Sequence, residues 1–118
     1  MTGTVSITNS TWLLVIADTT KSWSFQIPIS SPSPAPAQDS AEWIVERPRI
    51  GLSGPLTSLT HFGTVTFSGA TATGSGQTGP ISNFSATAIN MTGSTVLATP
   101  GPLNSAATGF TDQWTAQN

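Results

Sequence analysis

The chain of 118 residues contains no cysteine, one histidine and very few charged residues. Without cysteine it can form no disulfide, no thiolate nucleophile and no cysteine-ligated zinc site. Its longest apolar run, residues 12–17, is too short to span a membrane, and the N-terminal residues lack the basic start and apolar stretch of a signal peptide. Three Lys+Arg against five Asp+Glu exclude the basic patch of a nucleic-acid-binding protein. We therefore expect no nucleic-acid partner and no membrane partner.

Charged residues make up only 7% of the chain, where soluble domains average about a quarter. Serine and threonine take their place and supply 36 of the 118 residues. Acid unfolding depends largely on carboxylates that are paired in the fold, and this chain has few to protonate. Composition therefore favours acid tolerance, and equally allows a low-charge β module that never meets acid.

The hydrophobic pattern predicts strands and no helix. Eleven glycines and nine prolines interrupt the chain, and no segment has a helical period. The apolar run 12–17 is typical of a strand buried on both faces, and a turn at 18–21 joins it to the alternating segment 22–27 as a hairpin. The remaining predicted strands are 4–8, 41–47, 63–68, 84–91, 94–98 and 108–115. This spacing is typical of an antiparallel sandwich or barrel.

The segment 28–40 is rich in proline, with prolines at 28, 32, 34 and 36. Proline favours extended geometry and removes backbone donors, so this segment is predicted to lie outside the sheets. An interdomain linker or a peptide ligand would have the same composition. We prefer a surface loop within a single domain of residues 1–118.

Two features that could carry chemistry have simpler explanations. His61 would be needed for a Ser–His–Asp triad or a zinc site, but no second specific signal accompanies it. We interpret it as a polar residue at the start of a strand. Glycosylation sequons occur at Asn9, Asn83 and Asn90, and a chain so rich in serine and threonine produces such triplets by chance.

The most informative segment is S-A-E-W-I-V-E-R-P at residues 40–48. A strand there places Glu42, Ile44 and Glu46 on one face and Trp43 and Val45 on the other. With Trp43 and Val45 in the core, the two glutamates would face a cleft on a concave sheet. A solvated outer face is the alternative, although a chain this poor in charge has placed two of its five carboxylates together.

This segment and H-F-G-T-V-T-F at residues 61–67 together resemble the glutamic peptidases, or eqolisins, which are acid-acting endopeptidases of fungi and some bacteria. The hairpin 12–27 and the segments 90–91 and 109–114 resemble other strands of that family. The resemblance implies an all-β fold, an antiparallel β-sandwich of the jelly-roll, concanavalin-like type, or part of one.

The resemblance also implies functional roles. The family's catalytic dyad is one Glu and one Gln, and its Glu falls on Glu46, with Glu42 as a supporting residue of the substrate cleft. Glu46 would activate a water against a peptide bond while the Gln amide stabilises the oxyanion. Such chemistry uses no cofactor and no metal, and its substrate is a polypeptide. Family members are secreted, so we expect an extracellular protein.

Three departures from the family pattern stand out. Arg47 and His61 replace the aspartates usual at those positions. The upstream segment that carries the catalytic Gln has no counterpart, and the Q-T-G triplet at 77–79 follows the Glu strand in a predicted Gly-rich turn. The chain thus resembles the C-terminal half of an eqolisin. We expect it to be a poor peptidase alone and to need a complementing upstream chain or self-association.

Two other functions remain open. Jelly-roll glycosidases also place two glutamates on one strand, with carboxyl groups about 5–5.5 Å or 6.5–9.5 Å apart. Residues four apart on a strand have Cα atoms at about 13 Å, which long side chains can bridge. However, such enzymes usually have an Asp between the glutamates, where this chain has Ile44. The other alternative is a non-catalytic β-sandwich module that binds peptide or glycan.

Overall fold

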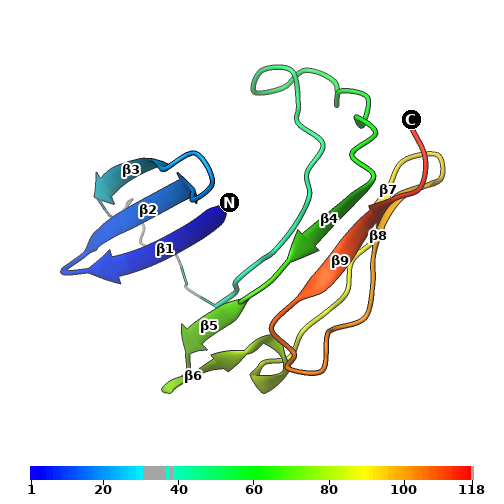
Figure 1. Ribbon diagram of the computed structural model, residues 1–118. Coiled ribbons are helices and arrows are strands. Elements are labelled where there is room, and N and C mark those ends of the chain that lie inside the picture. Colours follow the sequence, from blue (N-terminus) through cyan, green and yellow to red (C-terminus); the bar gives the residue numbers. More distant parts are fainter. Residues whose placement is uncertain (31–36, 38, 118) are drawn as a thin grey trace. The chain divides into compact units, whose positions relative to one another are not determined.

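The computed structural model describes residues 1–30, 37 and 39–117 (Figure 1). The chain divides into two compact units, Met1–Gln38 and Asp39–Asn118. None of the described residues belongs to a helix long and apolar enough to cross a membrane.

The first unit is one antiparallel sheet of three strands in the order β1-β2-β3. The strands are β1 (Thr2–Thr8), β2 (Thr11–Asp18) and β3 (Trp23–Ser30). A two-residue turn at Asn9 and Ser10 joins β1 to β2, with both residues at positive φ as a tight hairpin requires. At the next turn the Asp18 carboxylate accepts hydrogen bonds from the backbone N–H groups of Thr20 and Lys21. The expected hairpin is confirmed.

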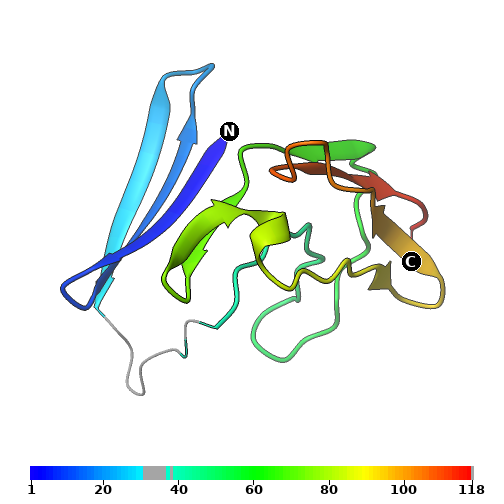
Figure 2. The same cartoon turned by 90° about the horizontal axis from the view of Figure 1, so that it is seen from below.

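The expectation that the apolar run 12–17 is buried on both faces is wrong for this unit. Its residues are half-buried or exposed, because the unit is a single layer whose strands satisfy one another's backbone groups without covering the faces (Figure 2). The strand register gathers the large apolar side chains on one face. That face carries Val5, Ile7, Trp12, Leu14, Ile16, Phe25, Ile27 and Ile29.

The second unit contains a four-stranded antiparallel sheet in the order β4-β9-β8-β7. Its strands are β4 (Thr64–Phe67), β7 (Met91–Thr92), β8 (Val96–Pro100) and β9 (Phe110–Trp114). A separate hairpin of β5 (Thr71–Gly74) and β6 (Gln77–Pro80) leads directly into the short 3-10 turn η1 (Ile81–Asn83) (Figure 2). The sequence predictions at 63–68, 94–98 and 108–115 are confirmed within a few residues.

Two further predictions for this unit are wrong, and one of its hairpins was not predicted. Residues 84–91 form no strand before Met91. The β5–β6 hairpin was not expected, and Gln77–Gly79 lies in its second strand rather than in a turn. The actual turn is Ser75-Gly76, where both residues have positive φ. Because this turn is only two residues long, the Gly- and Thr-rich segments on either side of it can pair as β5 and β6.

The predicted strand 41–47 does not form, although its periodicity is present. Trp43 and Val45 are half-buried, whereas Glu42, Ile44 and Glu46 are exposed. A strand also needs a hydrogen-bonded neighbour, and within the described part of the chain no strand pairs with this segment. The predicted alternation of half-buried and exposed side chains is therefore present, but the hydrogen bonds to a neighbouring strand are not.

The proline-rich segment begins later than expected. Pro28 lies within β3, where it pairs with Leu13, and β3 continues to Ser30. Pro28 occupies an edge strand, the position in a sheet that tolerates a missing donor. Residues 31–36 and 38 lie outside the described residues. The surface-loop and single-domain interpretations stay predictions.

The core of the second unit is small and centres on Leu97. Leu59, Leu97 and Ala98 are buried, and Phe62, Met91 and Trp114 pack against them. Leu97 is 0% exposed, and its carbonyl accepts hydrogen bonds from the N–H groups of Thr115 and Ala116. These hydrogen bonds thus hold the residues that follow β9 against β8, beside the core.

One acidic residue, Asp112, is buried in this sheet at 9% exposure. It lies in β9 between Val65 of β4 and Pro100 of β8, and its Oδ1 has no hydrogen-bond partner among the described residues. Burial raises the pKa of this carboxyl, and the backbone hydrogen bond at Gln113 lowers it by a smaller amount. The fold therefore favours the protonated form of Asp112.

Truncation of the core residue should be costly. We expect Leu97→Ala to lower the free energy of unfolding by about 2–5 kcal/mol, because it removes buried contacts and leaves a cavity. Urea denaturation followed by circular dichroism measures this loss. Leu52→Ala, at a fully exposed site of the same unit, should change stability by less than about 0.5 kcal/mol. Equal losses in the two variants would contradict the assignment of the core.

Asp112 should make the fold more stable in acid. Because its pKa is higher in the folded chain, this group adds stability as the pH falls through the folded pKa and withdraws it as the pH rises. We expect Asp112→Asn to be more stable than wild type at neutral pH, by about 1.4 kcal/mol for each unit between the folded and unfolded pKa values. The gap should close below about pH 4, where aspartate protonates in the unfolded chain as well.

Thermal unfolding between about pH 3 and pH 7, on either side of the ordinary aspartate pKa, tests this expectation. The exposed Asp39 provides the control substitution, Asp39→Asn. A stability difference for Asp112→Asn that does not vary across this range would contradict the raised pKa.

Candidate active site

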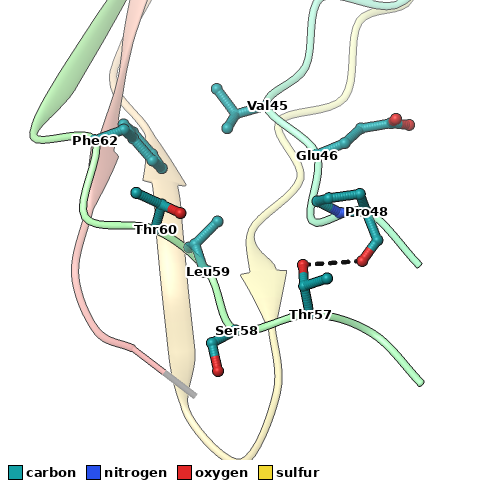
Figure 3. A pocket seen from close by; sticks show the side chains of 8 residues that line it. All are labelled: Val45, Glu46, Pro48, Thr57, Ser58, Leu59, Thr60 and Phe62. Atoms are coloured by element: carbon teal, nitrogen blue, oxygen red, sulfur yellow. Dashed lines mark hydrogen bonds between the residues drawn. The ribbon is translucent and has the colours of Figure 1, made fainter. Parts of the chain in front are cut away.

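A pocket of about 440 Å³ opens in the second unit between residues 45–48 and residues 57–62 (Figure 3). Its apolar lining comes from Val45, Pro48, Leu59 and Phe62. Glu46, Thr57, Ser58 and Thr60 supply the polar lining. Among these lining residues Glu46 is the one that carries a charge.

The two walls of the pocket are joined by a closed loop of residues 48–57. The Pro48 carbonyl accepts two hydrogen bonds from Thr57, one from its N–H at 2.9 Å and one from its Oγ1 at 3.0 Å. Farther along the loop, the Ile50 N–H donates to the Pro55 carbonyl and Arg49 Nη1 donates to the Gly54 carbonyl. A side chain at residue 54 would collide with the Ile50 carbonyl, which explains the glycine there.

Both motifs of the family resemblance contribute to this one pocket. Val45 and Glu46 come from the A-E-W-I-V-E segment, and Phe62 comes from H-F-G-T-V-T-F. Glu46, the residue that we expect to be catalytic, is therefore one of the residues that line the pocket. Its carboxylate points away from the 57–62 wall (Figure 3), and no hydrogen bond or ion pair engages it within the described residues. Glu42 is exposed on the same side of the segment but does not line the pocket.

His61 makes an aromatic contact with Trp114. Its ring lies against the Trp114 indole, with ring centroids 4.1 Å apart and an angle of 53° between the planes. Trp114 Nε1 is buried without a hydrogen-bond partner among the described residues. His61 thus packs at the start of the β4 segment, beside the pocket residue Phe62. Nothing in the sequence indicated its contact with β9.

None of the four described glutamines is among the residues that line the pocket. Gln26 is in β3 of the first unit, and Gln77 in β6 donates from Nε2 to the Asn83 carbonyl. Gln113 is exposed on β9, on the face opposite to Asp112, and Gln117 is exposed near the C-terminus. Gln38 falls outside the described residues. Among the described residues, no group of three or more His, Cys, Asp or Glu side chains could hold a metal.

Sequence reasoning missed the second wall of the pocket, residues 57–60. These residues have no clear period, and the pattern offered no reason to place them opposite Glu46. The usable signal was R-P-R-I-G-L-S-G-P at residues 47–55, whose glycines and prolines indicate a turn. A turn between the two motifs reverses the chain direction, so residues 57–60 come to lie opposite residues 45–48 across the pocket.

Comparison with known proteins bears on the family and the fold of the chain. No curated protein sequence matches the chain. Among solved structures, the crystal structure of aspergilloglutamic peptidase from Aspergillus niger matches with a TM-score of 0.74 and 26% identity. The match covers 97% of this chain and 65% of that chain, so this chain spans about two-thirds of its structural relative. The likeness confirms the expected fold class, an antiparallel β-sandwich or part of one.

The sequence profile described as the Peptidase A4 family matches residues 1–108. This match covers both motifs, the hairpin 12–27 and the pocket between the motifs. It agrees with the structural likeness to a glutamic peptidase and with the resemblance seen in the sequence. The chain therefore belongs to the Peptidase A4 family.

Proposed function

We propose that this chain carries the glutamate half of an acid-acting glutamic endopeptidase site, with Glu46 as the general base. The observation that supports this proposal best is the pocket itself. Two sequence motifs separated by a loop, each resembling the glutamic peptidases, line the same pocket, and Glu46 is its charged residue. The substrate is a polypeptide.

The chemistry of the proposal needs only a carboxylate, a water and an oxyanion donor. The ionised Glu46 carboxylate removes a proton from water as the water attacks the scissile carbonyl, and then returns the proton to the leaving amine. An ordinary glutamate is partly ionised at about pH 4, so a base of this type works in acid. Glu42, on the same exposed side, adds negative charge near the cleft and supports Glu46.

The pocket lining contains no glutamine, so the described glutamines of the second unit are not placed to supply the oxyanion donor. A side-chain amide has to lie within about 3 Å of the developing oxyanion to stabilise it. Gln77 and Gln113 are held in strands β6 and β9, and neither lines the pocket. We propose that a complementing polypeptide, or a second copy of the chain, supplies this amide.

The proposed environment is extracellular and acidic. Secretion is carried over from the family resemblance. The low charge of the chain and the raised pKa of the buried Asp112 both suit a fold that works in acid.

A second candidate function is a peptide-binding module without turnover. The lining of the pocket favours it, because it contains no glutamine and a pocket without an oxyanion donor can still hold a peptide. A folded chain that binds peptides and stays inactive with every complementing partner would establish this alternative.

The peptidase proposal predicts weak or absent cleavage by the chain alone and restored cleavage by a complemented chain. The substrate is a denatured protein at about pH 3.5, where a glutamate base is partly ionised. The complementing probe is the portion of aspergilloglutamic peptidase that the structural match leaves uncovered. Glu46→Gln should lower the restored rate about 100-fold or more, because it removes the general base.

Glu42→Gln is the matched control, since it removes the other carboxylate of the same segment. It should cost less activity than Glu46→Gln, and circular dichroism should show that both variants are folded. Equal loss in both variants would contradict the assignment of the base. Steady cleavage by the uncomplemented chain, abolished by Glu46→Gln, would instead show that another group of this chain replaces the missing amide.

A further inference from the structure

We propose that two copies of this chain associate through the apolar face of the first unit. In this dimer the β1-β2-β3 sheets of the two copies lie face to face, and each sheet covers the apolar side chains of the other. The partner is thus a second copy of this chain. The contact goes beyond the proposed function, because it involves neither the pocket nor Glu46.

The first observation is that the two faces of this sheet differ in chemistry. β2 lies between β1 and β3 and contributes apolar side chains to both faces (Figure 1). On one face the two outer strands place threonine, serine and glutamine, with Pro28 among them. An antiparallel sheet with one face covered and the other in water has this alternation. On the apolar face the same outer strands place Gly3 and six large side chains, Val5, Ile7, Trp23, Phe25, Ile27 and Ile29.

The second observation is the exposure of the apolar face. Each of these six large side chains is at least 41% exposed, and Val5 reaches 65%. With Ile16 of β2 they form a patch of roughly 600 Å², which is at the upper limit of what a monomer usually exposes in one place. Patches of that size mark interaction surfaces. The alternation of the strands and the exposure of the face therefore both call for a partner.

The near absence of charge narrows the kind of partner. Residues 1–30 contain two charged side chains, Asp18 and Lys21, and both lie at the turn between β2 and β3. The Asp18 carboxylate already accepts hydrogen bonds from two N–H groups of that turn. A membrane surface is bound through basic side chains beside the apolar ones, and a charged protein through opposite charges. A face without such charges instead suits a copy of itself, because the two meet without like-charge repulsion.

A second copy also matches the face in size and geometry. Two sheets can pack about 10 Å apart with their strand directions within about 30° of each other. Two copies of the patch would bury roughly 1,200 Å², the lower limit of a stable interface. The half-buried Trp12 and Leu14 of β2 lie on the same face and add to this area. Because both copies use the same face, the contact closes as a two-fold dimer and leaves no copy of the face exposed.

The oligomeric state of the full chain tests the proposal directly. Analytical ultracentrifugation from micromolar to submillimolar concentration should show a monomer–dimer equilibrium, with a limiting mass twice that of one chain. The mass of a single chain throughout this range would overturn the proposal, because the face would then be left in water or be covered within the chain. Open-ended aggregation without a defined dimer would overturn it as well.

A matched pair of substitutions on β3 locates the contact. Phe25→Lys and Gln26→Lys add the same charge at neighbouring exposed positions whose side chains lie on opposite faces. Phe25→Lys should weaken dimerisation about 100-fold or more, because each copy then brings an unpaired charge into an apolar contact. Gln26→Lys should change it by less than about threefold, as other surface substitutions do. Equal effects of the two variants would overturn the assignment of the face.

A second pair on β1 keeps the test decisive if Phe25→Lys fails to fold. Val5→Lys changes the apolar face and Ser6→Lys the opposite face, and both positions are exposed. Circular dichroism identifies the folded variants. A dimer that Val5→Lys leaves intact would show that the copies meet elsewhere and would overturn the proposal.

The dimer and the proposed peptidase chemistry can fail separately. Glu46→Gln should leave dimerisation unchanged while it removes the restored cleavage, because Glu46 lies in the second unit and outside the contact. The ultracentrifugation needs neither substrate nor turnover. A monomeric chain that is active when complemented would therefore refute the dimer alone, and a dimer that is inactive when complemented would refute the peptidase proposal alone.

Discussion

The candidate site depends on the two hydrogen bonds that Thr57 donates to the Pro48 carbonyl. Among the described residues, no strand pairs with residues 45–48, so this contact and the hydrogen bonds within the loop 48–57 hold them near residues 57–62. The two bonds share one acceptor and lie at the mouth of a turn whose glycines permit its close path. Without them, Glu46 and Phe62 would belong to independent segments. The pocket is thus a consequence of a local turn rather than of the sheet.

Local patterns predicted much of the fold because most of its strands pair with near neighbours. The hairpin of β2 and β3 and the strands β4, β8 and β9 followed from alternation and from turn residues. Two of the failures have one physical cause: periodicity reports which side chains face inward but not whether a backbone partner exists. Residues 41–47 keep the period and lack the partner, whereas β5 and β6 have a partner but too few large apolar residues to show a period.

The candidate site, like the fold, could be predicted only in part from the sequence. Glu46 could be identified because a recognisable motif surrounds it, and its exposure follows from its position opposite Trp43 and Val45. Leu59 and Thr60 could not be identified, because their role comes from the loop that returns the chain to Glu46. The contact of His61 with Trp114 joins residues more than fifty positions apart. Such a contact is set by the pairing of β4 with β9 and not by either local sequence.

Three buried side-chain atoms of the second unit lack a hydrogen-bond partner among the described residues: Arg47 Nη1, Asp112 Oδ1 and Trp114 Nε1. The backbone of residues 41–47, which are exposed or half-buried, also makes no hydrogen bond to another described residue. Each unmet buried group costs free energy unless water or another chain satisfies it. The missing strand pairing that makes the strand prediction at 41–47 wrong therefore leaves a row of backbone groups to be satisfied by water or by another chain.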